Sequence, residues 1–186
     1  MALSNTETRW GAVSKWLHWL IALLIIVASL IMWHANDSTY WFKSNVRIFL
    51  EWVHWHKALG LIAFALILFR LWWRRRQPVP QTDDLTDFEE RWSSRVHWAF
   101  YALMIALPIT GWLSSSLFGS TVNVFGLFVI PPITPENKEL VGPFYWAHFV
   151  MAWALTALVV FHIGAALYHH FVKRDRVLKS MLPEQE

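Results

Sequence analysis

Four long apolar stretches alternate with polar segments along the chain. They cover residues 13–33, 49–73, 96–118 and 144–172. A helix needs roughly 20 mostly apolar residues to cross the ~30 Å hydrocarbon layer of a membrane, and each stretch is long enough to do so. The pattern therefore predicts four membrane-spanning helices.

The segments between these stretches are predicted to be connections. Residues 35–45 are polar, residues 77–87 combine two prolines with a run of acids, and residues 119–142 contain three prolines and are long enough for a short interfacial helix. No small-residue cleavage site follows the first apolar stretch, so we expect it to remain in the protein as a helix. We expect an all-α integral membrane protein in which one domain, residues 1–186, forms a four-helix up-down bundle.

Lysine and arginine residues are concentrated on one side of the predicted membrane. That side carries Arg9, Lys15, Arg74, Arg75, Arg76, Arg91, Arg95, Lys173, Arg174, Arg176 and Lys179. The other side carries only Lys43, Arg47, Lys57 and Lys138. Because cytoplasmic loops of membrane proteins are enriched in basic residues, we expect both termini and the middle connection in the cytoplasm. Arg70, just before the basic cluster at residues 74–76, is interpreted as an anchor in the inner leaflet.

The composition narrows the chemistry that the chain can perform. With 56% hydrophobic and 16% charged residues, it is a membrane protein by composition alone. The absence of cysteine excludes disulfides, iron–sulfur clusters, thiolate ligation of haem and covalent haem attachment, which leaves histidine as the ligand for a metal or haem. We find no phosphate loop, dinucleotide fingerprint or nucleophile–base motif. The membrane orientation accounts for the basic residues, so we expect no nucleic-acid partner.

Nine histidines in so apolar a chain call for an explanation. An ionisable side chain at membrane depth is costly and usually faces the interior of a bundle. Six of them lie within the predicted helices at depths useful for a ligand, namely His18, His56, His97, His148, His162 and His169. His34 lies at the end of the first helix and is expected at the interface.

The spacing of two histidines predicts a ligand in each leaflet. His148 and His162 are fourteen residues apart, so they share one helix face and lie about 21 Å apart along its axis. By depth, His56 matches His148 in the outer layer, and His18 matches His162 in the inner layer. This geometry predicts two haems, each held between two histidines, which suits electron transfer because no iron position stays open.

Spacing alone leaves two alternatives open. His97 has a depth that would also allow it to face His18 or His162. His54 points about 160° away from His56 on the same helix, so only one of the two can face a haem.

The residues resemble the bacterial di-haem cytochrome b561 family over nearly the whole chain. The resemblance rests on Lys-Trp-Leu-His18-Trp-Leu, on His56 with Gly60 and Arg70, on His97 with Tyr101, Leu107, Pro108 and Gly111, and on His148, His162, His169 and His170. Family members include a superoxide oxidase coupled to ubiquinone. Two departures are the additional His34 and His54 and the dense tryptophan around the second helix.

The resemblance implies a set of roles for these residues. His18 and His162 would be the axial ligands of the cytoplasmic-side haem b, and His56 and His148 those of the outer haem b. His97 and His169 would then be free for propionate contacts, proton delivery or a quinone pocket. Among the cations on the outer side, Lys57 adjoins His56 and could steer superoxide or reach a propionate.

Three functional classes follow, with membrane lipid as the surroundings in each. The first is a superoxide or quinol oxidoreductase of the bacterial inner membrane that reduces ubiquinone. The second is a b-type electron-carrier subunit that needs a respiratory partner protein. The third is a non-haem proton or metal relay built from histidines, which is disfavoured because such relays commonly use carboxylates within the membrane, and we expect almost none in the helix interiors apart from Glu51.

Overall fold

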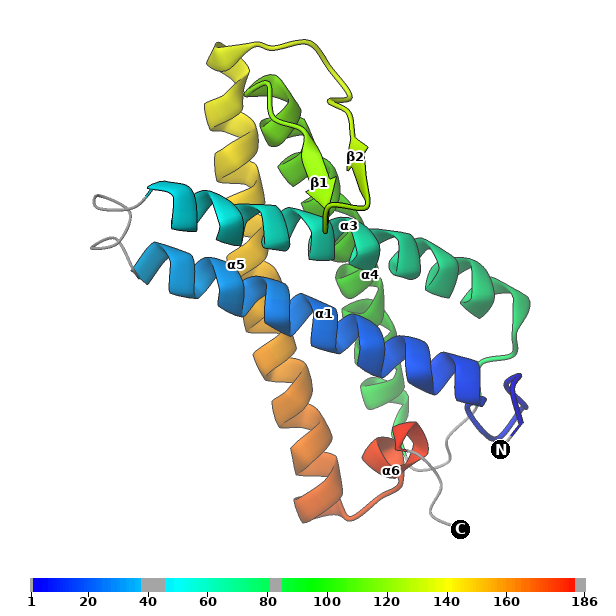
Figure 1. Cartoon of the computed structure of the whole chain (residues 1–186). Helices are drawn as coiled ribbons and strands as arrows, with labels where there is room; N and C mark the ends of the chain where they lie inside the picture. Colours follow the sequence, from blue (N-terminus) through cyan, green and yellow to red (C-terminus); the bar gives the residue numbers. More distant parts are fainter. Residues whose placement is uncertain (1, 38–45, 81–84, 183–186) are drawn as a thin grey trace.

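A computed structural model describes residues 2–37, 46–80 and 85–182 of the chain (Figure 1). Its four long helices are α1 (Ala12–Asp37), α3 (Val46–Arg76), α4 (Asp87–Leu117) and α5 (Lys138–Tyr168). Shorter elements are the strands β1 (Val122–Val124) and β2 (Phe128–Ile130), the π-helical turn η1 (His169–Lys173) and the helix α6 (Val177–Met181). All four long helices have the length and hydropathy needed to span a membrane, which confirms the all-α, four-span prediction.

Two helices begin earlier than their apolar pattern predicts. α4 starts at Asp87 rather than at residue 96, because Thr86 and Glu89 form a reciprocal capping box. Such a cap satisfies backbone N–H groups that a helix start leaves unpaired. α5 starts at Lys138 rather than at residue 144, with the Asn137 side chain accepting from the N–H of Glu139. The first turns of both helices contain polar residues, so the apolar pattern does not extend to the helix starts.

The connection between α4 and α5 contains a β-hairpin where a short helix was thought possible. Val122 and Val124 are buried while Asn123 between them is exposed, which is the two-residue period of a strand. Phe125 and Gly126 both have positive φ, as a tight hairpin turn requires. The hairpin packs through its two valines on Ala58 of α3, so it covers part of that helix.

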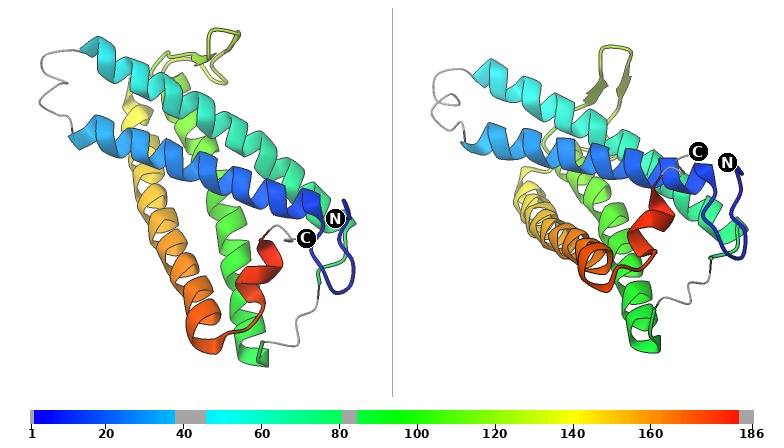
Figure 2. Two further views of the ribbon diagram at one scale, coloured as in Figure 1. Left: turned by 60° about the horizontal axis from the view of Figure 1, so that its bottom comes forward. Right: turned by 90° about the horizontal axis from the view of Figure 1, so that it is seen from below.

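The long helices form two antiparallel hairpins. α1 pairs with α3 and α4 pairs with α5, and the first hairpin lies across the second (Figures 1 and 2). A compact apolar cluster fills the place where α1, α3 and α4 meet; its buried members are Leu17, Ile21, Ala63, Ile67 and Tyr101. Many large apolar side chains outside this cluster are exposed, as lipid-facing walls require.

Three separate parts of the chain meet at one end of the molecule. Asn5 bonds Gln77 and Pro78 beyond the end of α3, at 3.1 Å in each case. Lys15 Nζ donates to the carbonyl of Leu182 at 3.0 Å. The N-terminal segment, the start of the α3–α4 connection and the C-terminal segment therefore lie together (Figure 2). We call this the basic end, because the arginines at 74–76 close α3 there.

Candidate functional site

Two histidines from different helix hairpins face each other away from the basic end. The rings of His56 on α3 and His148 on α5 lie 6.0 Å apart between centroids, with their planes at 89°. His56 Nδ1 bonds the carbonyl of Ala28 at 3.0 Å, and His148 Nδ1 bonds that of Leu107 at 2.9 Å. A carbonyl accepts, so each Nδ1 carries the proton and each Nε2 keeps its lone pair free for a metal. We call this the outer pair.

Gly111 on α4 makes room for one member of the outer pair. A Cβ built at this position would stand 3.0 Å from two atoms of the His148 imidazole. The glycine therefore lets α4 approach the ring closely. Pro108, one turn earlier in α4, removes the N–H that would bond the carbonyl of Met104. The residue before Pro108, Leu107, has the carbonyl that His148 bonds.

Three histidines gather nearer the basic end, one from each of three helices. His162 on α5 lies 6.2 Å from His18 on α1 and 5.9 Å from His97 on α4, measured between ring centroids. Ser93 Oγ bonds His97 Nδ1 at 3.3 Å. We call His18 and His162 the inner pair. Distance alone does not separate His18 from His97 as the partner of His162.

The separations in both pairs fit one metal ion held between two imidazoles. A metal–nitrogen bond is about 2 Å, so two nitrogens on opposite sides of one ion are about 4 Å apart and their ring centroids about 6 Å apart. Trp112 Nε1, next to Gly111 in α4, is a buried hydrogen-bond donor for which the described residues provide no acceptor. A bound group with an acceptor atom would satisfy it. Within the described ranges no three His, Asp or Glu side chains form a metal-binding group, so imidazole pairs are the available ligands.

The other histidines of this region lie outside the pairs. His54 is exposed, although it is only two residues from His56 in α3. His34 is also exposed, near the end of α1, where its ring meets Trp52 at 5.5 Å. The structure therefore brings His56, and not His54, to His148.

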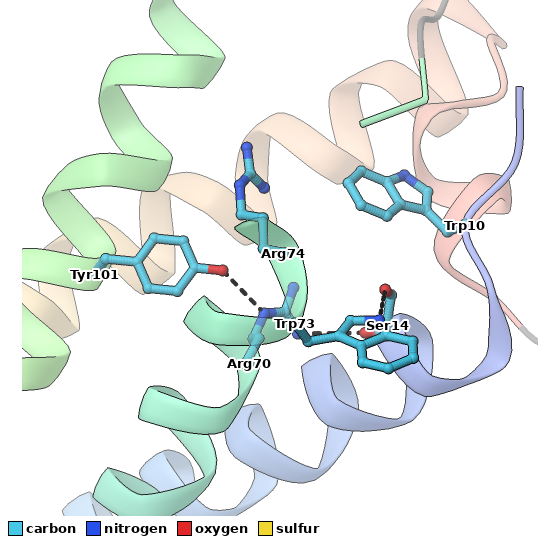
Figure 3. A pocket seen from close by; sticks show the side chains of 6 residues that line it. All are labelled: Trp10, Ser14, Arg70, Trp73, Arg74 and Tyr101. Carbon is cyan, nitrogen blue, oxygen red and sulfur yellow. Dashed lines mark hydrogen bonds between the residues drawn. The ribbon is translucent and has the colours of Figure 1, made fainter. Parts of the chain in front are cut away.

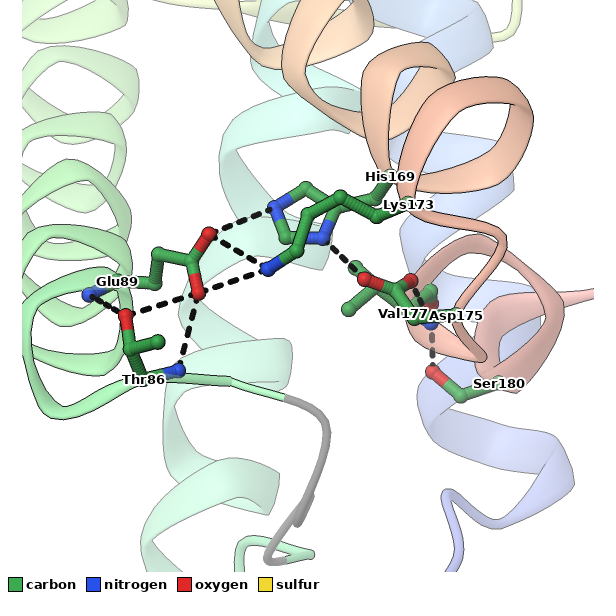
Figure 4. Close-up of polar contacts among 7 residues, drawn as sticks. All are labelled: Thr86, Glu89, His169, Lys173, Asp175, Val177 and Ser180. Carbon is green, nitrogen blue, oxygen red and sulfur yellow. Dashed lines mark hydrogen bonds and ion pairs between the residues drawn. The ribbon is translucent and has the colours of Figure 1, made fainter.

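A polar cluster joins the end of α5 to the start of α4 (Figure 4). His169 Nδ1 bonds the carboxylate of Asp175, and His169 Nε2 lies 4.0 Å from Glu89 Oε1. Lys173 Nζ donates to both oxygens of Glu89, at 2.7 and 2.9 Å. We call these four residues the His169 cluster.

The backbone after α5 explains how Asp175 reaches His169. η1 ends at Lys173. The next residue, Arg174, is left-handed with φ 57°, so the chain turns back and the N–H of Asp175 donates to the carbonyl of His169. Burial of the Asp175 carboxylate opposes its ionisation. The hydrogen bonds from His169 and from the N–H of Val177 outweigh that effect and hold the pKa of Asp175 below its ordinary value of 3.8. Asp175 therefore stays ionised at neutral pH and fixes the orientation of the imidazole.

Sequence reasoning named His169 but missed its two carboxylate neighbours. Asp175 was hidden in a charged tail, and only the left-handed turn at Arg174 brings it back. Glu89 lay before the predicted start of the third helix at residue 96, and the structure places it in the first turn of α4 rather than in a helix interior. The Thr86-x-x-Glu89 capping motif was the signal that could have placed Glu89 in a helix.

Among the predicted outer cations that the structure describes, Lys57 lies closest to the candidate ligands in the chain. It is half-buried and follows His56 directly in α3. Arg47 pairs with Glu51 one turn on, at 3.5 Å, and Lys138 is exposed at the first position of α5. Lys43 lies outside the described residues.

A multi-pass helical membrane protein with paired imidazoles between its helices, and no cysteine, belongs to the class of membrane b-type cytochromes. The model of the prokaryotic cytochrome b561 family matches residues 9–184. The chain belongs to that family. It is therefore a haem-binding membrane protein and, at this coarse level, an oxidoreductase that transfers electrons.

Three curated relatives align along almost their whole lengths. The chain is 31% identical to cytochrome b561 homolog 2 of Escherichia coli (strain K12), with 98% of this chain and 95% of the relative covered. It is 25% identical to cytochrome b561 homolog 1 of the same organism, with 96% and 99% covered. It is 28% identical to the probable superoxide oxidase CybB of Yersinia pestis, with 91% and 93% covered.

Proposed function

We propose that the protein carries electrons across the bacterial inner membrane through two haems b, from superoxide on the outer side to ubiquinone near the basic end. The observation that carries this proposal is the presence of two imidazole pairs at separations of 6.0 and 6.2 Å, with His148 and His162 fourteen residues apart on one helix. Four turns of α5 separate His148 and His162 by about 21 Å, a distance that supports one site in each half of the membrane.

His56 with His148 would hold the outer haem, and His18 with His162 would hold the inner haem. A haem held between two histidines would supply one-electron transfer rather than oxygen binding. The carbonyls of Ala28 and Leu107 hold the outer imidazoles in one tautomer. Such second contacts orient a ligand and raise its basicity.

The outer donor proposed is the superoxide anion. Lys57 is its proposed electrostatic guide, because a cation beside His56 raises the local concentration of a small anion. Superoxide gives up one electron and leaves as oxygen. Two such events supply the two electrons that convert one ubiquinone, with two protons, into ubiquinol. The name of the Yersinia pestis relative favours this donor.

The proton donor proposed for the quinone is His169, with His97 as the other candidate. His169 Nδ1 is held by Asp175, so Nε2 is the atom that can give a proton and then recover it. Glu89 lies 4.0 Å from that nitrogen and can stabilise the imidazolium when it forms. His97, by contrast, lies against His162 and bonds only Ser93 among the described residues.

The experiment that tests the proposal is a reduced-minus-oxidised absorbance spectrum with haem counted per polypeptide. We expect two haems b in the purified wild type and one in each of His56→Ala and His162→Ala. His54→Ala is the matched control, because it removes an exposed imidazole two residues from His56, and it should keep both haems. One haem in the wild type, or no loss in His56→Ala, would contradict the pairing.

A second assay separates an enzyme from a carrier subunit. Purified protein with ubiquinone is exposed to a steady source of superoxide, and ubiquinol formation is followed. We expect turnover without any other protein. Full haem loading with no turnover would favour the electron-carrier subunit, which needs a partner protein.

A further inference from the structure

Arg70, which the sequence suggested as a leaflet anchor, is half-buried and contacts neighbouring helices. It comes from α3 and contacts α1 and α4: its guanidinium donates to the hydroxyl of Tyr101 and to the carbonyl of Ser14, each at 3.4 Å (Figure 3). Tyr101 belongs to the buried cluster and is only 5% exposed. If Arg70 extended toward the lipid headgroups, its guanidinium would not contact the buried Tyr101.

The charge of Arg70 has no counter-ion in the described part of the chain. Its two hydrogen bonds are long and go to neutral oxygens, and no described carboxylate pairs with it. An unpaired charge at membrane depth is costly, and such groups usually pair with an opposite charge. A bound anion would therefore compensate the charge of Arg70, since no carboxylate among the described residues does so.

Arg70 lies near the inner pair. Its hydrogen-bond partners Ser14 and Tyr101 lie one helical turn from His18 and from His97, respectively. Arg70 also follows His56 by fourteen residues in α3. Arg70 therefore lies on the His56 face of α3, about 21 Å nearer the basic end. α3 thus offers a ligand to the outer site and a guanidinium to the inner one.

A small open pocket surrounds Arg70. Its lining comes from the N-terminal segment and from α1, α3 and α4, and consists of Trp10, Ser14, Arg70, Trp73, Arg74 and Tyr101. Arg74 is one helical turn from Arg70, so the pocket has two guanidinium groups. Trp73 is held in place by donating to Ser14 Oγ at 3.2 Å. Two guanidinium groups beside aromatic side chains suit a planar apolar ligand that carries two carboxylates.

We propose that Arg70, assisted by Arg74, binds the propionate carboxylates of the inner haem. The proposal rests on the assignment of that haem to His18 and His162. A guanidinium can bond a carboxylate through two N–H groups, which fixes its direction as well as its position. The arginine also stabilises the reduced haem relative to the oxidised one, because oxidation adds positive charge nearby.

The test compares Arg70→Gln, Arg70→Lys and Arg75→Gln in the detergent-purified holoprotein. Arg75 is the matched control, since it is exposed near the end of the same helix. Each variant is titrated by spectroelectrochemistry after its haems are counted. In Arg70→Gln we expect two haems, a lower midpoint potential for the inner haem and an unchanged potential for the outer haem. Arg75→Gln should match the wild type.

Infrared difference spectra separate direct contact from a field effect. With haem labelled by ¹³C at its propionate carboxyls, the label-sensitive bands of the inner haem should shift in Arg70→Gln. Should that variant not retain the inner haem, Arg70→Lys carries the test, because it keeps the charge and loses the two-pronged bond. Unshifted potentials and unshifted carboxylate bands in a two-haem variant would overturn the role of Arg70. A wild type without two haems would instead overturn the proposed function.

Discussion

His162 has two imidazoles at nearly equal distance, and mutation can decide which one shares a haem with it. The centroid separations are 6.2 Å to His18 and 5.9 Å to His97. His18→Ala should remove the inner haem and leave the outer one, because one axial ligand alone holds haem b weakly. His97→Ala should keep two haems with a low-spin spectrum. Haem per polypeptide checks both, and loss of the inner haem only in His97→Ala would exchange the two roles.

Asp175 should make the stability of the α5 end depend on pH. Its pKa is lowered below 3.8, so its contribution is complete above that value and is lost as the pH falls through the lowered pKa. Asp175→Asn should cost about 1 kcal/mol at pH 7, or about 2–4 °C in melting temperature. The difference between variant and wild type should shrink as both are melted at pH values descending below 4.

Glu90→Gln is a suitable control for the pH series. Glu90 is exposed in the first turn of α4, next to Glu89. The Glu90→Gln substitution removes one carboxylate from the same region without changing the contacts of His169. A pH profile for Asp175→Asn that runs parallel to the wild type would mean that Asp175 does not act through its ionisation.

The spacing of α4 and α5 depends on one missing methyl group. In Gly111→Ala the new Cβ would meet the His148 imidazole at 3.0 Å, so the ring or the helix must shift. Overpacking of this kind costs about 1–3 kcal/mol. We expect less outer haem per polypeptide with the inner haem retained. Gly142→Ala is the control, because nothing lies within 4 Å of a Cβ there.

The long helices could be predicted from the sequence, but their ends and connections could not. Apolar length alone fixes a membrane span, and it correctly located α1, α3, α4 and α5. The first turns of α4 and α5 are polar and depend on capping by Thr86 and Asn137, which hydropathy does not detect. The hairpin at residues 122–130 is too short to give a clear alternation in an otherwise apolar chain.

The candidate site divides in a similar way. Helix spacing and depth suggested that His56 meets His148 and that His18 meets His162, and these rings do lie together. Spacing left His54 and His97 open as alternatives, and the structure places His97 beside His162 as well. Asp175 and Arg70 depend on a left-handed turn and on the crossing of three helices. These are tertiary features, so no local pattern revealed what the two side chains contact.

At the scale of the whole molecule, the absence of cysteine makes the orientation in the membrane easy to test. The β-hairpin lies between the end of α4 and the start of α5, and the basic end lies toward the other ends of these two helices, so we expect the hairpin on the outer side. In intact spheroplasts a membrane-impermeant maleimide should label Thr121→Cys and not Lys179→Cys. Permeabilised cells should allow both to react. Labelling of Lys179→Cys alone in intact cells would reverse the orientation and with it the proposed direction of electron flow.

The order of the two proposed haems can be read from which substrate reduces which haem. If electrons enter at the outer pair and leave at the inner pair, His56→Ala should block reduction of the inner haem by superoxide. The same variant should still allow ubiquinol to reduce the inner haem, because the quinone is proposed to bind near His169. His162→Ala should show the opposite, with superoxide reducing the outer haem and no ubiquinol formed. Stopped-flow spectra of the two variants check this, and ubiquinol formation in His56→Ala at the wild-type rate would place the superoxide reaction at the inner haem.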